Sequence, residues 1–339
     1  MPKGIIIGTF MPLTKGHLQL IRFAQAYVSN IYVIISTRSF EPFVQERVAA
    51  VWDVAYPLGF HHSDNKAPQA PKDSNSEKEF WDYWKTAIES LVGAINADDI
   101  LFTSETYGAP LSYALGCRWI PFNQYRETIS ISATEIRKAP LTNFYLIAPQ
   151  QQPDFRRIIT FFGAESCGKT TLSKAVSTVL PSYWIPEYAR EYLETFGEEI
   201  TEEKMIDIWK GQFASQTAAA ALEDKPCLLQ DTDLLSTIGY YRIWGKEPPA
   251  GLIQNFLQSF SDLYIIMNDK IPFSPDPLRY GGDKRESGVE FWASLCQEYG
   301  VKYHIMEATK AEEQLEEALE VIKKDFYCHI APLMDFIRG

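Results

Sequence analysis

The chain has 339 residues, of which 46% are hydrophobic and 22% charged, and its formal net charge is −12. Because single hydrophobic cores stop growing at about 250–300 residues, this length predicts two domains. The acidic balance argues against a general nucleic-acid binder, which needs a basic face, but it allows small nucleotides to bind at local cations and helix ends.

Cysteine usage and hydropathy indicate a soluble protein of a reducing compartment. The five cysteines are scattered without a C-x-x-C pair, so we expect neither disulfides nor a zinc site. No run approaches the about 18–20 apolar residues of a membrane span. Met1-Pro2-Lys3-Gly4 leads directly into a strand-like run and leaves no room for a signal peptide. We expect a cytoplasmic protein without membrane or nucleic-acid partners, and the sequence leaves its oligomeric state open, a homo-oligomer included.

Two strand–glycine loop–helix patterns divide the chain, one starting at Ile5 and the other at Ile158. Between them, residues 149–154 are polar and contain two prolines, Pro149 and Pro153, a composition typical of a linker. Each half alternates β-branched runs with helical patterns, as parallel α/β sheets do. We therefore predict an α/β protein with two parallel-sheet domains, residues 1–148 and 155–339, joined by the linker 149–154.

The strands that we predict are short and apolar. They are Ile5–Ile7, Ile31–Ser36, Ile100–Thr103 and Trp119–Phe122 in the first half, and Ile158–Phe162, Tyr183–Ile185, Cys227–Gln230, Tyr264–Met267 and Lys302–Met306 in the second. Residues 61–78 are polar and contain prolines, so we expect a surface loop there. Ala311–Lys324 has apolar residues on one face and is predicted to be a packing helix.

The first strand runs into Gly8-Thr9-Phe10-Met11-Pro12-Leu13-Thr14-Lys15-Gly16-His17, which precedes a helical pattern. Glycines after a buried strand let a nucleotide approach the backbone, and the helix that follows offers its positive end to phosphates. A histidine at this helix start can donate to phosphate oxygens. A lone histidine is more often structural, and here the surrounding motif favours the functional interpretation.

This segment resembles the (H/T)-x-G-H signature of the nucleotidyltransferase superfamily, and Ser132-Ala133-Thr134-Glu135-Ile136-Arg137 resembles its S-x-T-x-x-R signature. The resemblance implies a Rossmann-like domain in which His17 contacts the transferring phosphate and Arg137 holds the outgoing pyrophosphate. Thr14 stands where many members have a first histidine. The ATP-binding residues that it implies are Gly8, Thr9, Phe10, Gly16, His17, Ser132, Thr134 and Arg137.

Such a reaction needs no protein nucleophile, because a phosphate of the acceptor attacks the α-phosphorus of ATP directly. Catalysis then consists of positioning and charge stabilisation, for which Thr14, Lys15, His17 and Arg137 are the candidates. A Mg²⁺ ion is expected to bridge the triphosphate oxygens.

Three further stretches resemble the NadR type of nicotinamide mononucleotide (NMN) adenylyltransferase: residues 43–47, residues 103–108, and the tryptophan pair Trp81 and Trp84. The resemblance implies NMN as the acceptor, bound by Trp81, Trp84 and Arg47. The two tryptophans are one helical turn apart, so both could present an aromatic face to a pyridinium cation. A pair of core aromatics would have the same spacing.

The second pattern leads into Gly163-Ala164-Glu165-Ser166-Cys167-Gly168-Lys169-Thr170-Thr171, a complete G-x-x-x-x-G-K-T phosphate-binding loop. In such a loop backbone N–H groups cradle the phosphates, Lys169 reaches the β and γ oxygens, and the Thr170 hydroxyl faces Mg²⁺. Cys167 is interpreted as a small filler. The predicted ATP-binding residues of this half are Gly163, Glu165, Ser166, Cys167, Gly168, Lys169, Thr170 and Thr171.

Carboxylates at the ends of two predicted strands indicate a kinase. Glu187 follows Tyr183–Ile185, where small nucleoside kinases keep the base for the attacking hydroxyl. Asp231 and Asp233 follow Cys227–Gln230, and we expect Asp231 to hold Mg²⁺ together with Thr170. Either aspartate alone is also a common helix N-cap.

The segment from Pro186 to Tyr192, the strand end at Asp231-Thr232-Asp233 and the phosphate-binding loop together resemble the ribosylnicotinamide kinase half of NadR-type enzymes. The riboside-binding residues expected on this basis are Glu187, Arg190, Asp233, Tyr240 and Trp244. Arg279 is expected in a lid over ATP, in a segment that has Pro277 where D-G-L-R has glycine. Residue 4 already begins the first strand, so we expect none of the DNA-binding module that some members carry.

Two alternatives stay open at this point. One keeps both folds and changes the acceptors, giving an adenylyltransferase for another phosphorylated cofactor precursor and a different nucleoside kinase. The other makes the second half a regulatory nucleotide-binding module without a substrate.

Overall fold

The computed structural model describes residues 1–64, 77–128, 130, 132–270 and 287–335. The chain divides into two compact units, Met1–Asp154 joined by the residues from Ala331 onward, and Phe155–Ile330. The segment 149–154, which we predicted to be a linker, belongs to the first unit. Two of its polar residues, Gln151 and Gln152, are buried, and Gln151 Oε1 accepts from the N–H of Leu13 at 2.5 Å.

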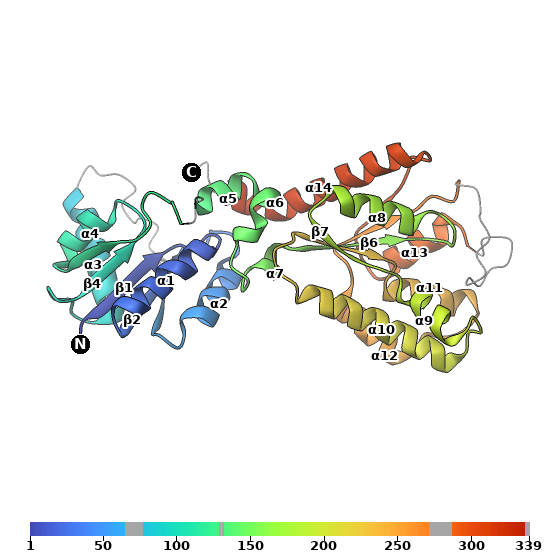
Figure 1. The fold of residues 1–339 in the computed structure, drawn as a ribbon, viewed down its shortest axis with the longest axis horizontal. Helices are drawn as coiled ribbons and strands as arrows, with labels where there is room; N and C mark the ends of the chain where they lie inside the picture. The colour runs from blue at the N-terminus through green and yellow to red at the C-terminus, as the bar shows by residue number, and fades with distance from the viewer. Residues whose placement is uncertain (65–76, 129, 131, 271–286, 336–339) are drawn as a thin grey trace. The chain divides into compact units, whose positions relative to one another are not determined.

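The first unit is built on a parallel sheet of β1 (Lys3–Gly8), β2 (Asn30–Thr37), β3 (Phe60–Asp64), β4 (Ile100–Thr103) and β5 (Arg118–Pro121) in the order β3-β2-β1-β4-β5 (Figure 1). Our prediction of a loop from residue 61 was wrong at its start, because Phe60–Asp64 pairs with β2. The sequence FHHSD lacks an apolar signal because this is an edge strand.

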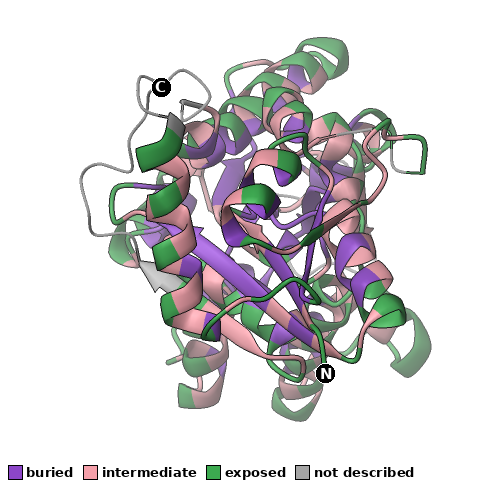
Figure 2. Cartoon of the chain, turned by 90° about the vertical axis from the view of Figure 1, so that its left-hand side faces the viewer, coloured by how far each residue is buried: buried purple, intermediate pink, exposed green. Residues whose placement is uncertain are grey.

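Helices cover both faces of this sheet. They are α1 (Lys15–Tyr27), α2 (Val44–Ala55), α3 (Glu77–Val92), α4 (Gly108–Leu115), α5 (Ala133–Lys138), α6 (Pro140–Asn143) and the short η2 (Phe144–Leu146), followed by α7 (Gln152–Phe155). Ile6 packs with α1 and α2, whereas its neighbour Ile5 packs with α3 and α4 on the opposite face. Both faces are therefore buried, as in other parallel sheets, and Figure 2 shows these strands buried behind helices whose outer faces are exposed.

The second unit has a parallel sheet of β6 (Arg157–Phe162), β7 (Ser182–Ile185), β8 (Cys227–Asp231), β9 (Leu263–Ile266) and β10 (Tyr303–Ile305) in the order β10-β9-β6-β8-β7. All five lie where the sequence predicts strands. The helices are α8 (Lys169–Val179), α9 (Tyr188–Phe196), α10 (Glu202–Ala220), α11 (Leu234–Ile243), α12 (Ala250–Ser259), α13 (Val289–Glu298) and α14 (Ala311–Asp335). The predicted two-sheet α/β fold is confirmed.

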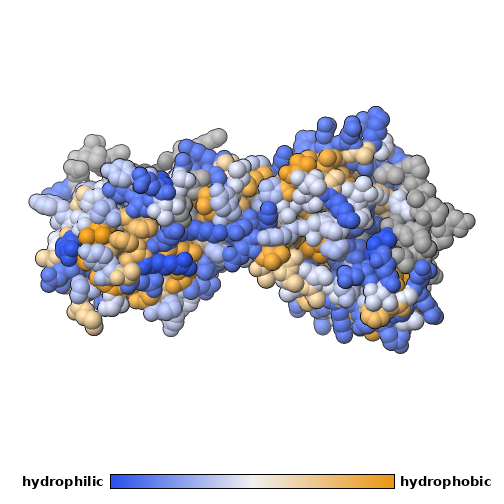
Figure 3. Space-filling view, viewed as in Figure 1, coloured by the Kyte–Doolittle hydropathy of each residue, from blue (hydrophilic) through white to orange (hydrophobic). Residues whose placement is uncertain are grey.

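The surface of the described residues is mixed in polarity. Hydrophilic side chains are interspersed with small hydrophobic groups over both units on the face seen in Figure 3. No helix in the described part of the chain is both long enough and apolar enough to cross a bilayer.

Candidate active sites

The loop after β1 is shaped by an aromatic ring. Phe10 has a φ of 47°, in the left-handed region, and is buried. Its ring lies against Gly8, where a Cβ would come within 3.3 Å of it, and makes an edge contact with the His17 ring at a centroid distance of 5.0 Å. The packing of Phe10 thus fixes His17 relative to the loop that leaves the sheet.

Thr14 and His17 form a capping box at the start of α1. The Thr14 hydroxyl accepts from the backbone N–H of His17 at 3.2 Å, and His17 Nδ1 accepts from the backbone N–H of Thr14 at 3.0 Å. Because Nδ1 is an acceptor, the ring proton of the neutral imidazole sits on Nε2. Burial, assisted by the charge of Arg126, lowers the pKa of His17 to about 4. His17 is therefore a neutral N–H donor at physiological pH.

The second motif meets the first through Arg137. Ser132 caps α5 by accepting from the N–H of Glu135, and the Glu135 carboxylate accepts from the N–H of Ser132. Arg137 on this helix donates to the carbonyl of Met11 in the β1–α1 loop and to the hydroxyl of Thr134 at 3.0 Å. Burial and the charge of Arg47 lower the pKa of Arg137. The structure thus brings together the two segments that the sequence assigned to one ATP site.

Arg47 has a different environment from the one that we expected. Its side chain is fully buried, and its guanidinium donates to the carbonyl of Thr9 at 2.9 Å and to the Glu41 carboxylate at 2.7 Å. Its observed role is to hold the β1–α1 loop against the start of α2. Its contact with NMN stays a prediction.

The two tryptophans of α3 contribute to the hydrophobic core of the first unit. Trp81 and Trp84 are half-buried and pack against a cluster that includes Ile5, Ile34 and Leu101. Tyr107, from the segment 103–108, donates to the carbonyl of Ile7 at 3.1 Å and so lies near the end of β1. A substrate-lining role for the two indoles and a phosphate role for Lys15 stay predictions.

In the second unit, the phosphate-binding loop has the backbone that its sequence requires. Gly163 and Gly168 have φ values of 130° and 89°, and Ser166 between them has 54°. The Lys169 ammonium donates to the carbonyls of Gly163 at 3.1 Å and Ala164 at 2.7 Å. Its charge is therefore held inside the loop, within reach of an entering phosphate.

Cys167 serves the same loop. Its thiol is buried and donates to the carbonyl of Ala164 at 2.8 Å. These contacts agree with its interpretation as a small internal filler.

Thr170 and Asp231 form a pair beneath this loop. Phe161 of β6 and Asp231 of β8 are register partners, so the carboxyl ends of the two strands lie side by side. The Thr170 hydroxyl donates to Asp231 Oδ2 at 2.5 Å, whereas the buried Oδ1 has no partner among the described residues. A hydroxyl and a buried carboxylate with a spare oxygen are the ligands that Mg²⁺ takes beside phosphates, so the residues fit that ion.

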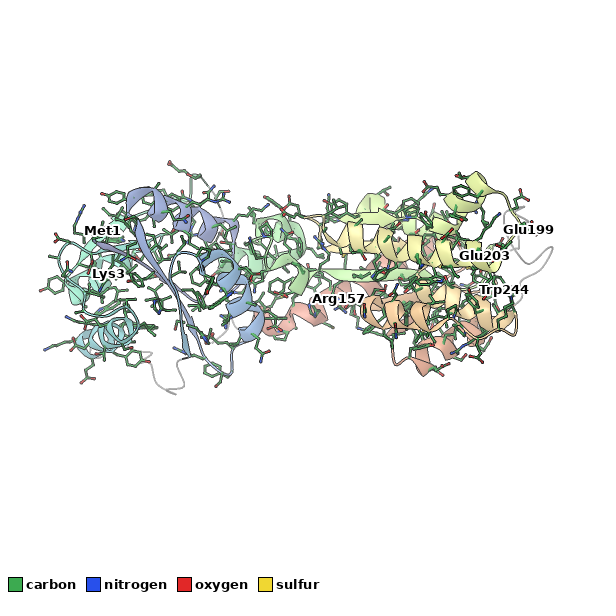
Figure 4. The ribbon with its side chains drawn as sticks, turned by 90° about the horizontal axis from the view of Figure 1, so that it is seen from below. Met1, Lys3, Arg157, Glu199, Glu203 and Trp244 are labelled. Atoms are coloured by element: carbon green, nitrogen blue, oxygen red, sulfur yellow. The ribbon has the colours of Figure 1, made fainter. Side chains whose placement is uncertain are left out.

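A pocket beside the loop gathers all five residues that were predicted to bind the riboside, together with two residues of the loop segment. It is lined by Glu165, Lys169, Glu187, Arg190, Asp233, Tyr240 and Trp244. In Figure 4, Trp244 and Arg157 lie at opposite ends of the second unit, and Arg157 begins β6. The pocket is therefore on the carboxyl side of the strands, where α/β sheets bind their ligands.

Asp233 caps a helix and also lies at the pocket. Its Oδ1 caps α11 by accepting from the N–H of Leu235 at 3.0 Å, and Oδ2 accepts from the Tyr264 hydroxyl at 2.5 Å. Burial raises the pKa of Asp233 to about 6. The N-cap role is observed, and the same residue lines the pocket.

Other pocket residues carry no sequence signal of their own. Gln212, Thr232, Ser236 and Thr237 also line the pocket, and Ser236 Oγ is buried without a partner among the described residues. Gln212 lies within α10, and Ser236 and Thr237 lie within α11. The sequences of both helices carry no functional motif at these positions, so only the tertiary packing shows that the side chains line the pocket. Arg279, predicted in a lid, lies outside the described residues.

Comparisons with known proteins agree with this arrangement. The profile of the family described as "AAA domain" matches residues 158–314. The Trifunctional NAD biosynthesis/regulator protein NadR of Escherichia coli (strain K12) is 24% identical over 346 aligned positions, covering 95% of this chain and 82% of the relative. The protein of that name from Salmonella typhimurium is 24% identical over 90% of this chain and 79% of its own.

Two solved structures have the same fold along almost the entire chain. A NadR protein in complex with NR has a TM-score of 0.62 at 20% identity, and one in complex with NAD and AMP-PNP has 0.62 at 22% identity. Each comparison covers 96% of both chains. In sequence and in fold, the chain is therefore similar to NadR proteins across both of its units.

Proposed function

We propose that the chain is a bifunctional enzyme of NAD biosynthesis. In the second unit, the γ-phosphoryl group of ATP passes to the 5′-hydroxyl of nicotinamide riboside, giving NMN and ADP. In the first unit, the phosphate of NMN attacks the α-phosphorus of another ATP, giving NAD and pyrophosphate. The names of the curated relatives, and the NR, NAD and AMP-PNP bound to the solved NadR structures, support this proposal.

The observation that carries the kinase assignment is the pocket in which Glu187 and Lys169 meet Tyr240 and Trp244. A carboxylate beside the phosphate lysine can accept the proton of an attacking hydroxyl, and a purely regulatory nucleotide site would not need one. The aromatic rings offer a face to a pyridinium cation, which contributes about 0.5–2 kcal/mol depending on desolvation.

In the kinase reaction, Glu187 accepts the 5′-hydroxyl proton while the Lys169 ammonium exchanges a loop carbonyl for a phosphate oxygen. Thr170 and Asp231 would hold the metal, for which we propose Mg²⁺; it would offset the charge of the β and γ oxygens. Asp233 is held by hydrogen bonds from Leu235 and Tyr264, and we expect it to accept a further hydrogen bond from a substrate hydroxyl.

In adenylyl transfer no side chain acts as a nucleophile. His17 donates through Nε2 to an oxygen of the α-phosphate, and Arg137 stabilises the departing pyrophosphate with the hydroxyls of Ser132 and Thr134. These donors already point from a fixed loop and two helix starts, so little reorganisation is needed when charge develops.

The test is incubation of the purified chain with nicotinamide riboside, ATP and Mg²⁺, followed by chromatography of NMN, NAD, ADP and pyrophosphate. We expect NMN first and NAD afterwards. A second reaction, started from NMN, isolates adenylyl transfer. Failure to phosphorylate the riboside would reject the kinase half, and failure to convert NMN would reject the adenylyltransferase half.

A further inference from the structure

Gln212 of α10 is a buried polar residue that the proposed chemistry does not use. Its side chain is only 4% exposed, and both ends of its amide are hydrogen bonded. Oε1 accepts from the backbone N–H of Tyr188 at 2.8 Å, and Nε2 donates to the carbonyl of Thr232 at a longer 3.4 Å. One side chain thus ties together the segments that follow β7 and β8.

The bond to Tyr188 secures the start of α9. The first N–H groups of a helix have no partner within the helix, and Glu187, at the N-cap, makes no side-chain capping bond. Gln212 supplies the missing acceptor. The Tyr188 ring also lies directly over Gly211, where a Cβ would come within 2.0 Å of it. Consecutive residues of α10 therefore fix the first turn of α9 and, with it, Glu187.

The bond to Thr232 holds an unusual turn. Thr232 has a φ of 67°, a left-handed conformation that a β-branched residue rarely adopts. It separates Asp231, which is bonded to Thr170, from Asp233, which is bonded to Tyr264. The N–H of Thr232 donates to the carbonyl of Phe161 at 3.1 Å, so this bond and the one from Gln212 hold the two sides of its backbone.

We propose that Gln212 is a positioning residue that sets the separation between the base Glu187 and the metal-binding Asp231. Glu187 lies just after β7 and Asp231 is the last residue of β8, and Gln212 is hydrogen bonded to the residue after each of them. The inference rests on the proposed kinase function, because it gives Gln212 a role in that reaction. Its effect is on geometry, so loss of the amide should lower kcat and leave substrate affinity nearly unchanged.

Gln216, one turn further along α10, provides a matched control. It is also 4% exposed and donates to a backbone carbonyl, that of Ser259 at 2.7 Å. Among the described residues it makes no hydrogen bond to α9 or to the Thr232 turn. Gln212→Leu and Gln216→Leu each remove one buried amide. We expect kcat for riboside phosphorylation to fall about 10–100-fold in Gln212→Leu, as a misplacement near 1 Å does, with KM values within about 3-fold. Gln216→Leu should keep the wild-type kcat.

Amide hydrogen exchange tests the inference without any substrate. Gln212→Leu should speed exchange at Tyr188 and at residues 231–233, whereas Gln216→Leu should leave both unchanged. Gln212→Glu keeps the acceptor for Tyr188 but loses the donor for Thr232, so it should restore protection at Tyr188 alone.

Unchanged exchange at Tyr188 in Gln212→Leu, or an equal loss of kcat in both leucine variants, would overturn the proposal. If the wild-type chain does not phosphorylate the riboside, the proposed function fails. The exchange comparison still decides in that case whether Gln212 holds the two segments.

Discussion

The guanidinium of Arg137 donates a hydrogen bond to the carbonyl of Met11. This bond joins the start of α5 to the loop between β1 and α1, two segments more than a hundred residues apart in the chain. Because Thr134 and His17 are fixed on the same two segments, the donors proposed for one triphosphate come from a single connected frame.

The first prediction concerns His17. His17→Ala should lower kcat for NMN adenylylation by about 10²–10³, which is typical for the loss of one preorganised donor. Kinase activity on the riboside should be retained in the same preparation. His61→Ala is the control, since His61 stacks on Tyr32 at the β3 edge of the same unit. An unchanged adenylylation kcat in His17→Ala would show that the histidine is structural.

The lowered pKa of His17 predicts a pH dependence of stability. The pKa is about 4 in the folded chain and near 6.5 in the unfolded one, so the unfolded state binds more protons between these values. The contribution of His17 is therefore complete above pH 6.5 and is lost as the pH falls towards 4. The unfolding temperature of His17→Gln, measured relative to that of the wild type, should therefore rise as the pH is lowered through this window. If calorimetry shows the same difference in unfolding temperature between the two proteins at every pH, the lowered pKa of His17 is contradicted.

The two activities should be separable. Lys169→Ala removes the ammonium held at Gly163 and Ala164, so it should abolish NMN formation from the riboside while NAD formation from added NMN persists. Lys174→Ala, on the same helix, is the control because Lys174 packs over Trp184. Loss of both reactions in a folded Lys169→Ala protein would reject two independent ATP sites.

The buried ion pair between Arg47 and Glu41 should be important for the stability of the first unit. Arg47→Ala leaves Glu41 buried and unpaired, which typically costs about 3–5 kcal/mol. We expect a lower unfolding temperature of the first unit and a loss of adenylyl transfer, measured by calorimetry and by the NMN assay.

The double variant Arg47→Met/Glu41→Leu separates stability from activity. Replacing a buried ion pair by apolar residues is often neutral for stability, so the double variant should recover much of the unfolding temperature. It should not recover adenylyl transfer, because the donor to the Thr9 carbonyl is still missing. A single variant as stable as wild type would contradict the importance of the ion pair.

Ser236 should contribute to binding of the riboside. Its hydroxyl is buried, lines the kinase pocket and has no partner among the described residues, so Ser236→Ala removes no bond of the unliganded protein. We expect unchanged thermal stability and a rise of about 3–10-fold in KM for the riboside, the value of one hydrogen bond. Ser294→Ala on α13, whose hydroxyl already donates to the carbonyl of Phe291, is the control. An unchanged KM would remove Ser236 from the substrate contacts.

Local sequence determined the two glycine-containing loops that follow the first strand of each unit, and the central strands. The run from Gly163 to Thr170 and the run from Gly8 to His17 each contain their own glycines, helix start and preceding apolar strand. The backbone of such a segment depends on its own residues, so it can be inferred without knowledge of its neighbours. Glu187, Asp231 and Asp233 could be located near strand ends for the same reason, because each lies at or within two residues of the end of β7 or β8.

Tertiary structure decided what could not be read locally. Phe60–Asp64 is a strand because β2 offers it a pairing edge, although its own residues are mostly polar. Arg47 is buried and holds the β1–α1 loop because it donates hydrogen bonds to Glu41 and Thr9. The sequence motif shows only that a positive charge is present at this position. Gln212 and Ser236 gain their significance from residues that are distant in the chain. Buried polar contacts such as those of Arg47 and Gln212 have no period or spacing in the sequence, because the two partners meet only when the helices pack on the completed sheet.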